Sequence, residues 1–112
     1  MQLELEGRAV PLDDEGYLLE PAEWDEKIAL VFADQEEIVL REEHWAVIRY
    51  MREYYESHQT IPDARHVIKY LSEYLGKAST GRNDLFRLFP YGYVKQACRI
   101  AGMRRPRAWS TG

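Results

Sequence analysis

The sequence contains one cysteine, Cys98, among its 112 residues, which excludes an internal disulfide and any metal site built from several cysteines. A lone cysteine is typical of a reducing compartment, so we expect a cytoplasmic protein. The longest apolar runs, 28–33 and 47–48, are far shorter than the roughly 20 residues of a membrane span. Residues 1–6 alternate apolar with acidic side chains and lack the regions of a signal peptide. We therefore expect no membrane partner.

Motifs for cofactors and conventional catalysis are also missing. The three histidines, His44, His58 and His66, are 14 and 8 residues apart, which does not match the i, i+4 pair of a zinc-binding helix. The glycines form neither the G-x-G-x-x-G nor the G-x-x-x-x-G-K-[ST] phosphate loop. The carboxylates fall on helix faces that we expect to be solvated. The sequence therefore predicts no metal, no cofactor and no carboxylate acid/base pair.

Charge is distributed very unevenly along the chain. Residues 1–43 carry 14 Asp and Glu against three Lys and Arg, a net charge of −11, whereas residues 44–112 carry five acids and 12 bases, a net charge of +7. From Arg87 onward there is no acidic residue. A basic segment of this kind attracts anionic partners, either nucleic acid or an acidic protein surface. The alternative is that it pairs with the acidic N-terminal half.

Apolar periodicity predicts a helix-dominated α+β domain. Short apolar alternations separated by turn residues predict a three-stranded β-meander at 3–5, 9–10 and 17–19. Helical spacing predicts about five helices, at about 24–34, 42–57, 63–75, 83–89 and 94–101. Asp63 and Asn83 are expected to cap two of them, and Gly76 to end one. We expect one domain over 1–102, a mobile loop at 77–82 and a flexible C-terminal arm at 103–112.

Cys98 is the candidate sulfur-accepting thiol. Lys95 and Arg99 flank it in sequence, and nearby positive charge favours the nucleophilic thiolate. Cys98 also shares the apolar face of its predicted helix with Val94 and Ala97, and a cysteine in that position is often a small buried hydrophobic residue. The sequence leaves both interpretations open.

The predicted helices 42–57 and 63–75 are separated by a short connector and form a possible helix-turn-helix. In this arrangement Arg65 and Lys69 would enter a DNA groove. Acidic residues flank the first helix and would repel phosphates, so this signal is weak.

Several segments together resemble the TusE/DsrC family over essentially the whole chain. They are Arg87-Leu88-Phe89-Pro90-x-Gly92-x-x-Lys95-Gln96-Ala97-Cys98-Arg99-x-Ala101-Gly102-Met103, with Asp14-Glu15-Gly16-Tyr17-Leu18, Glu43-His44-Trp45 and Pro62-x-x-Arg65-x-x-x-Lys69. Members of the family include the gamma subunit associated with dissimilatory sulfite reductase and the sulfur-relay protein TusE. The resemblance implies a small meander against an array of helices that includes a helix-turn-helix, and a flexible C-terminal arm.

The resemblance also implies a chemistry that this chain has altered. Family members carry persulfide sulfur on a penultimate cysteine at the tip of the arm, and some have a second cysteine eleven residues earlier. Cys98 matches the earlier cysteine, and Trp109 stands eleven residues later, where the carrier cysteine is expected. The arm also gains Arg104 and Arg107 relative to the family pattern. Standard persulfide carriage is therefore not expected.

Three hypotheses follow. In the first, a non-enzymatic relay-related protein docks sulfur-relay proteins or a sulfite reductase-like complex through basic residues; any activity would be of the sulfurtransferase type. The proposed docking residues are Lys95, Arg99, Arg104 and Arg105. In the second, the protein is a DNA-binding or regulatory member that uses Arg65 and Lys69. In the third, Cys98 is buried, Trp109 packs back on the domain, and the protein functions only within an assembly.

Overall fold

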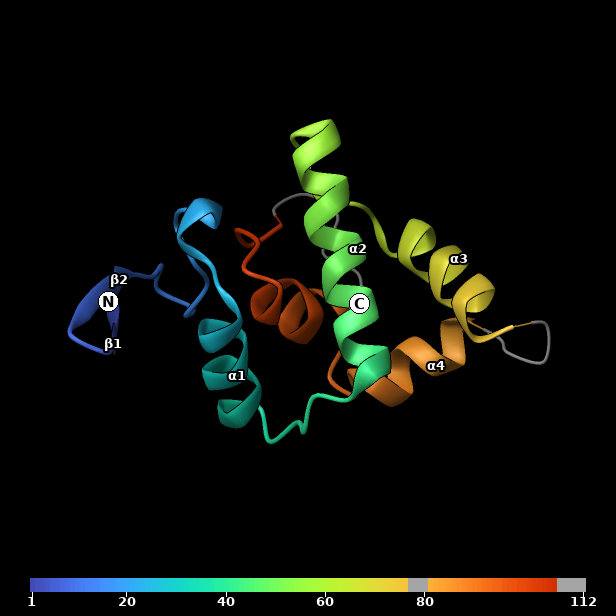
Figure 1. The fold of residues 1–112 in the computed structure, drawn as a ribbon, viewed down its shortest axis with the longest axis horizontal. Coiled ribbons are helices and arrows are strands. Elements are labelled where there is room, and N and C mark those ends of the chain that lie inside the picture. Colours follow the sequence, from blue (N-terminus) through green and yellow to red (C-terminus); the bar gives the residue numbers. More distant parts are fainter. Residues whose placement is uncertain (77–80, 107–112) are drawn as a thin grey trace.

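A computed structural model describes residues 1–76 and 81–106 (Figure 1). A β-hairpin lies at one end, and helices pack beside it toward the other end. The elements are β1 (Gln2–Leu5), β2 (Arg8–Pro11), the 3₁₀ turn η1 (Pro21–Glu23), α1 (Glu26–Gln35), α2 (Glu42–His58), α3 (Ala64–Leu75), α4 (Gly81–Leu88) and the π-helical segment η2 (Tyr93–Cys98). The α+β class is confirmed. In the described part of the chain, α1–α4 and η2 correspond to the five predicted helices.

The N-terminal sheet has two strands, so the prediction of three was wrong. β1 and β2 pair antiparallel around a two-residue turn, where Glu6 and Gly7 both have positive φ, 51° and 78°. The expected third strand contributes only an isolated bridge between Leu12 and Leu18. Leu18 is fully buried, and the demand for burial in the core outweighs further strand pairing at this position.

Local capping sets the starts of α1 and α3. The Asp25 carboxylate accepts a hydrogen bond from the Ile28 backbone amide (3.0 Å), so α1 begins at Glu26, slightly later than expected. Asp63 accepts from the backbone amide of His66 (3.2 Å), as predicted for an N-cap. Gly76 follows α3 with φ of 98°, which confirms the predicted end of that helix.

The prediction that Asn83 caps a helix was wrong, because α4 already begins at Gly81. A Cβ atom at Gly81 would lie 2.1 Å from the Ile68 carbonyl oxygen of α3. Glycine is therefore required where the two helices approach. The predicted loop over 77–82 falls mainly on residues 77–80, which lie outside the described residues.

The segment predicted as an α-helix at 94–101 is instead π-helical over Tyr93–Cys98, followed by a short helical turn. In Figure 1 this orange-red segment lies between α1 and α2. Only Lys95 of its six residues is exposed, so η2 is a central part of the hydrophobic core.

The start of the expected C-terminal arm is anchored to the domain. Met103 is fully buried, and its backbone amide donates to the Cys98 carbonyl (2.9 Å). Pro106 is also buried. Residues 107–112, including Trp109, lie outside the described residues, so the extent of an arm stays a prediction. No helix in the described ranges is long and apolar enough to cross a membrane.

Candidate functional site

The Cys98 thiol lies at the end of η2 and is fully buried. Burial raises the pKa of Cys98 to about 12, because an apolar surrounding disfavours the charged thiolate. At pH 7 a thiol with this pKa is protonated. In this conformation Cys98 is a neutral thiol without access to solvent.

Two tyrosines lie close to this thiol. The Tyr93 side chain lies beside Cys98, and its hydroxyl donates to the Pro62 carbonyl. The Tyr17 hydroxyl donates to the carbonyl of Val94 (2.9 Å), and burial raises the pKa of Tyr17 to about 12. The phenols therefore stay neutral and fix η2 to both the N-terminal segment and the α2–α3 connector.

The cations that flank Cys98 in sequence are directed to other groups. The Arg99 guanidinium pairs with the Glu36 carboxylate (2.9 Å) and lies over the Phe32 ring, 4.3 Å from its centroid. The Arg99 side chain is only 12% exposed. Lys95 is exposed and has no ion pair within the described part of the chain. Proximity in sequence therefore does not produce an activated thiolate here.

Sequence reasoning missed a buried polar connection beneath this region. Gln96 is 1% exposed; its side chain donates to Glu36 (3.0 Å) and accepts from the Tyr91 backbone amide (2.9 Å). Glu36 thereby binds both Gln96 and Arg99, which are 60 and 63 residues later. No local sequence pattern identifies a partner at such a separation.

An open surface hollow of about 620 Å³ lies over this arrangement. Its lining residues are Glu15, Tyr17, Glu36, Tyr91, Lys95 and Arg99. Because Glu36 is paired with Arg99 and Glu15 with Arg105 (3.1 Å), Lys95 supplies the unpaired charge among these described lining residues. Tyr91 beside it is 74% exposed. The hollow therefore presents an aromatic ring and a cation to a partner.

The structure separates the four predicted docking residues into two kinds. Arg99 and Arg105 are paired within the chain, with Glu36 and Glu15. Lys95 and Arg104 are exposed and have no ion pair in the part that the structure describes. Only these last two present a free charge.

The predicted DNA-contacting residues lie on α3. Arg65 is 86% exposed and 3.4 Å from Asp63, and Lys69 is 79% exposed and 4.0 Å from Glu73. Each cation thus has an acidic neighbour that weakens its attraction for phosphate. Helices α2 and α3 are joined by residues 59–63, but a role of this helix pair in DNA binding stays a prediction.

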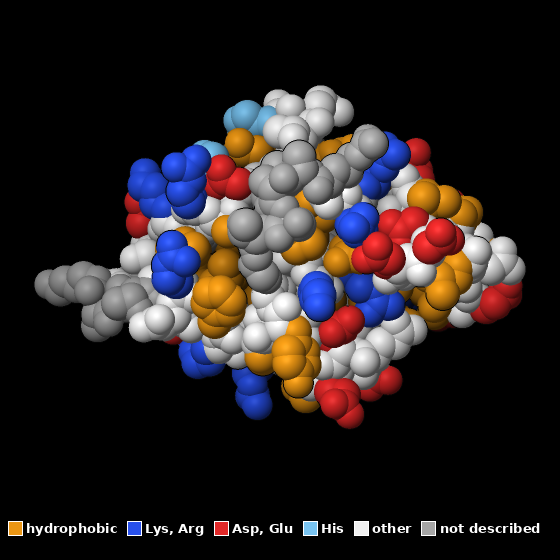
Figure 2. All heavy atoms as spheres, turned by 180° about the vertical axis from the view of Figure 1, so that it is seen from behind, with side chains coloured by type: hydrophobic (Ala, Val, Ile, Leu, Met, Phe, Trp, Pro, Cys, Tyr) orange, Lys and Arg blue, Asp and Glu red, His pale blue; other side chains and the backbone are white. Residues whose placement is uncertain are grey.

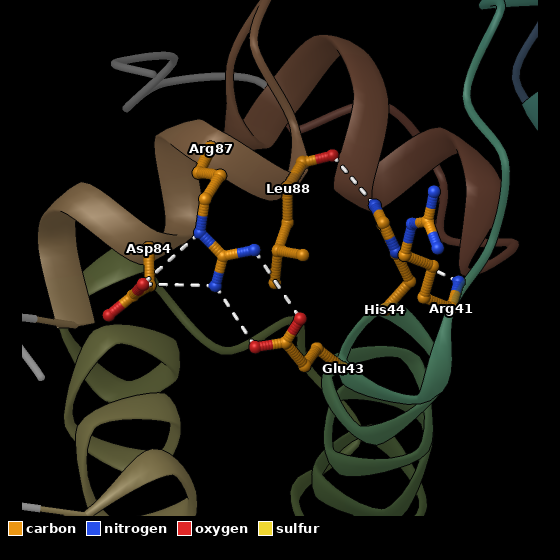
Figure 3. A network of polar contacts seen from close by, with 6 residues as sticks. All are labelled: Arg41, Glu43, His44, Asp84, Arg87 and Leu88. Carbon is orange, nitrogen blue, oxygen red and sulfur yellow. Dashed lines mark hydrogen bonds and ion pairs between the residues drawn. The ribbon is translucent and has the colours of Figure 1, made fainter.

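A second polar network fixes the segment that leads into η2 (Figure 3). Arg87 of α4 binds Glu43 at the start of α2 and Asp84 on its own helix, both at 3.0 Å. The His44 ring donates from Nε2 to the Leu88 carbonyl (2.9 Å) and accepts at Nδ1 from the Arg41 amide (3.0 Å). These contacts join the N-terminus of α2 to the C-terminus of α4.

The described residues include no group of three or more His, Cys, Asp or Glu side chains arranged to hold a metal ion. This statement covers residues 1–76 and 81–106. The candidate site consists of the buried Cys98 thiol, the neutral phenols of Tyr17 and Tyr93, and the partly basic hollow.

The sequence model of the family described as DsrC like protein matches residues 4–108. The chain belongs to this family. A relative named "Sulfurtransferase TusE" from Photorhabdus laumondii is 42% identical over 106 residues, which are 95% of this chain and 96% of the relative. The protein of the same name from Escherichia coli K12 is 41% identical over 101 residues, 90% of this chain and 93% of that protein.

Solved structures give the same assignment. The oxidized gamma subunit of the dissimilatory sulfite reductase (DsrC) from Archaeoglobus fulgidus superposes with a TM-score of 0.88 at 34% identity, covering 97% of this chain and 99% of that chain. Allochromatium vinosum DsrC superposes with a TM-score of 0.84 at 41% identity, covering 96% of each chain. Both the α+β fold and the TusE/DsrC resemblance drawn from the sequence are thus confirmed.

Proposed function

We propose that this DsrC-family protein is a sulfur-relay protein that docks sulfur-transfer partners but does not carry persulfide on a C-terminal cysteine. Its relatives are named as a sulfurtransferase and as a sulfite reductase subunit, which supports a relay role. The sequence has Trp109 at the position where the family resemblance places the carrier thiol. The proposal places this function in the cytoplasm.

The observation that carries the proposal is the contrast between an inaccessible thiol and an accessible basic surface. Cys98 is fully buried, whereas Lys95 and Arg104 are exposed without ion pairs in the described part of the chain. A partner's sulfur cannot reach Cys98 in this conformation, but an acidic partner surface can reach both cations. Electrostatic complementarity of this kind mainly increases the rate and specificity of association.

Sulfur carriage is tested by incubating the protein with a persulfide-charged sulfurtransferase and measuring its intact mass. We expect no persistent adduct of about 32 Da, the mass of one sulfur atom, because Cys98 is buried and protonated. A stoichiometric adduct that disappears in Cys98→Ser would show that this thiol carries sulfur and would overturn this part of the proposal.

Docking is tested separately by surface plasmon resonance with the same sulfurtransferase. The double variant Lys95→Glu and Arg104→Glu should weaken binding at least tenfold and reduce its dependence on salt. The matched double variant Arg49→Glu and Arg82→Glu changes the net charge by the same amount at exposed arginines of α2 and α4, outside the hollows that Lys95 and Arg104 line, and should retain most of the affinity. An equal loss in both variants would mean that net charge, not this face, governs the interaction.

A further inference from the structure

A second open hollow lies at the junction of the N-terminal segment, the end of α2 and the C-terminal segment. It has a volume of about 590 Å³, within the range of about 300–1,000 Å³ that small-molecule sites occupy. Its lining residues are Asp13, Leu18, Leu19, Tyr55, Gln59, Thr60, Ile61, Arg104, Arg105 and Pro106. None of the residues around Cys98 takes part in it.

About half of the wall of this hollow is apolar. Leu19 is 46% exposed, on the side of its extended segment opposite to buried Leu18. Tyr55 and Ile61 line the same hollow and are only partly buried. An apolar ring or branched chain placed here would remove this surface from water, which stabilises binding in proportion to the area covered.

The polar residues of the hollow favour an anion. Arg104 is exposed and has no ion pair in the described part of the chain, and Arg105 pairs with Glu15 at the edge. The lining carboxylate of Asp13 accepts hydrogen bonds from the backbone amides of Glu15 (2.8 Å) and Tyr17 (3.0 Å). Asp13 is thus occupied within its own turn, while the free guanidinium of Arg104 matches a carboxylate or sulfonate.

We propose that this hollow binds a small organic anion in which an aromatic or branched apolar group lies next to a carboxylate or sulfonate. The apolar group packs against Leu19 and Ile61, and the anion pairs with Arg104. Figure 2 shows the charge context: acidic side chains predominate on the half with the hairpin, and basic ones on the half with α3 and α4. This site uses neither Cys98 nor Lys95, and it shares only Arg104 with the proposed docking surface.

The experiment is an NMR titration of the full chain, labelled with ¹⁵N, with naphthalene-2-sulfonate at low ionic strength. We expect saturable shifts of the amides at 18–19, 59–61 and 104–105. Naphthalene-2-methanol, which lacks the charge, should bind at least tenfold more weakly, and inorganic sulfate should not saturate these shifts. Such a pattern requires both the apolar wall and the guanidinium.

Variants separate this site from general electrostatic attraction. Arg104→Ser should weaken naphthalene-2-sulfonate binding about tenfold or more, in line with loss of a charge-assisted hydrogen bond. Leu19→Ser should weaken it as well, whereas Arg82→Ser on exposed α4 should leave it unchanged. Shifts elsewhere, equal effects of Arg104→Ser and Arg82→Ser, or equal binding of the uncharged alcohol would overturn the proposal.

One further variant tests whether the chain itself fills the hollow. Trp109→Ala should leave the affinity for naphthalene-2-sulfonate within about twofold of the original protein. An increase of tenfold or more would show that the C-terminal residues compete for the hollow and would overturn its assignment to a small ligand.

Discussion

Replacing Gly102 by alanine should destabilise the fold at the place where the chain leaves η2. Gly102 has φ of 77°, and a Cβ atom there would lie 2.2 Å from Cδ1 of Trp24. The indole cannot move away freely, because its Nε1 donates to the Ile100 carbonyl (2.8 Å) and Arg52 lies 4.4 Å from the ring centroid. Arg52 in turn donates to the Ala101 carbonyl (3.0 Å), so displacement of Trp24 disturbs several contacts together.

The expected loss has two parts that a matched variant separates. The left-handed backbone costs a non-glycine residue about 1–2 kcal/mol, and overpacking against Trp24 adds about 1–3 kcal/mol. Gly7 has nearly the same φ, 78°, but a Cβ atom there would have no neighbour within 4 Å. Gly7→Ala should therefore show the backbone cost alone, and Gly102→Ala about 2–5 kcal/mol in total.

Urea denaturation followed by far-UV circular dichroism measures both variants. A domain of this size has a free energy of unfolding of about 5–15 kcal/mol, so a loss of this magnitude produces a large shift of the midpoint. Equal losses for Gly7→Ala and Gly102→Ala, within about 0.5 kcal/mol, would refute the reasoning, since they would show that Trp24 does not restrict residue 102.

Three further outcomes are expected. Native Cys98 should react with a thiol reagent far more slowly than the denatured chain, because it is fully buried; equal rates would contradict the burial. Burial lowers the pKa of His44 below its ordinary 6.5, so the unfolded chain binds the proton first. Urea denaturation should show the free energy of unfolding nearly constant between about pH 7 and 8 and falling from about pH 6.5 downward, with His44 contributing at most about 1.4 kcal/mol per pH unit and a smaller fall in His44→Gln. DNA binding through Arg65 and Lys69 predicts a mobility shift at low salt that Arg65→Ala and Lys69→Ala weaken, and absence of any shift would eliminate it.

The sequence predicted those features of the fold that depend on neighbouring residues. Asp63 and Gly76 bound α3 as expected, because an N-cap carboxylate and a glycine with positive φ act within one turn of the chain. The start of α4 could not be predicted in this way. Gly81 is determined by its approach to the Ile68 carbonyl, a contact that exists only once the two helices pack.

The candidate site shows the same limit. The sequence identifies its central residue, Cys98, and leaves both burial and activation of the thiol open. Position in the core decides between them, because desolvation of the thiol outweighs any effect of the flanking cations. The π-helical geometry of η2 was not predicted either, since apolar spacing alone does not distinguish it from an α-helix.

The uneven charge of the chain is explained in part by pairing between its two halves. Glu36 binds Arg99, Glu43 binds Arg87 and Glu15 binds Arg105, each joining an acidic N-terminal residue to a basic C-terminal one. These pairs hold η2 and its flanking segments against the N-terminal half. Half of the predicted basic docking residues are thus paired internally, and the other two, Lys95 and Arg104, line different hollows. Changing Lys95 alone should consequently weaken protein docking and leave small-anion binding unchanged, whereas changing Arg104 alone should weaken both.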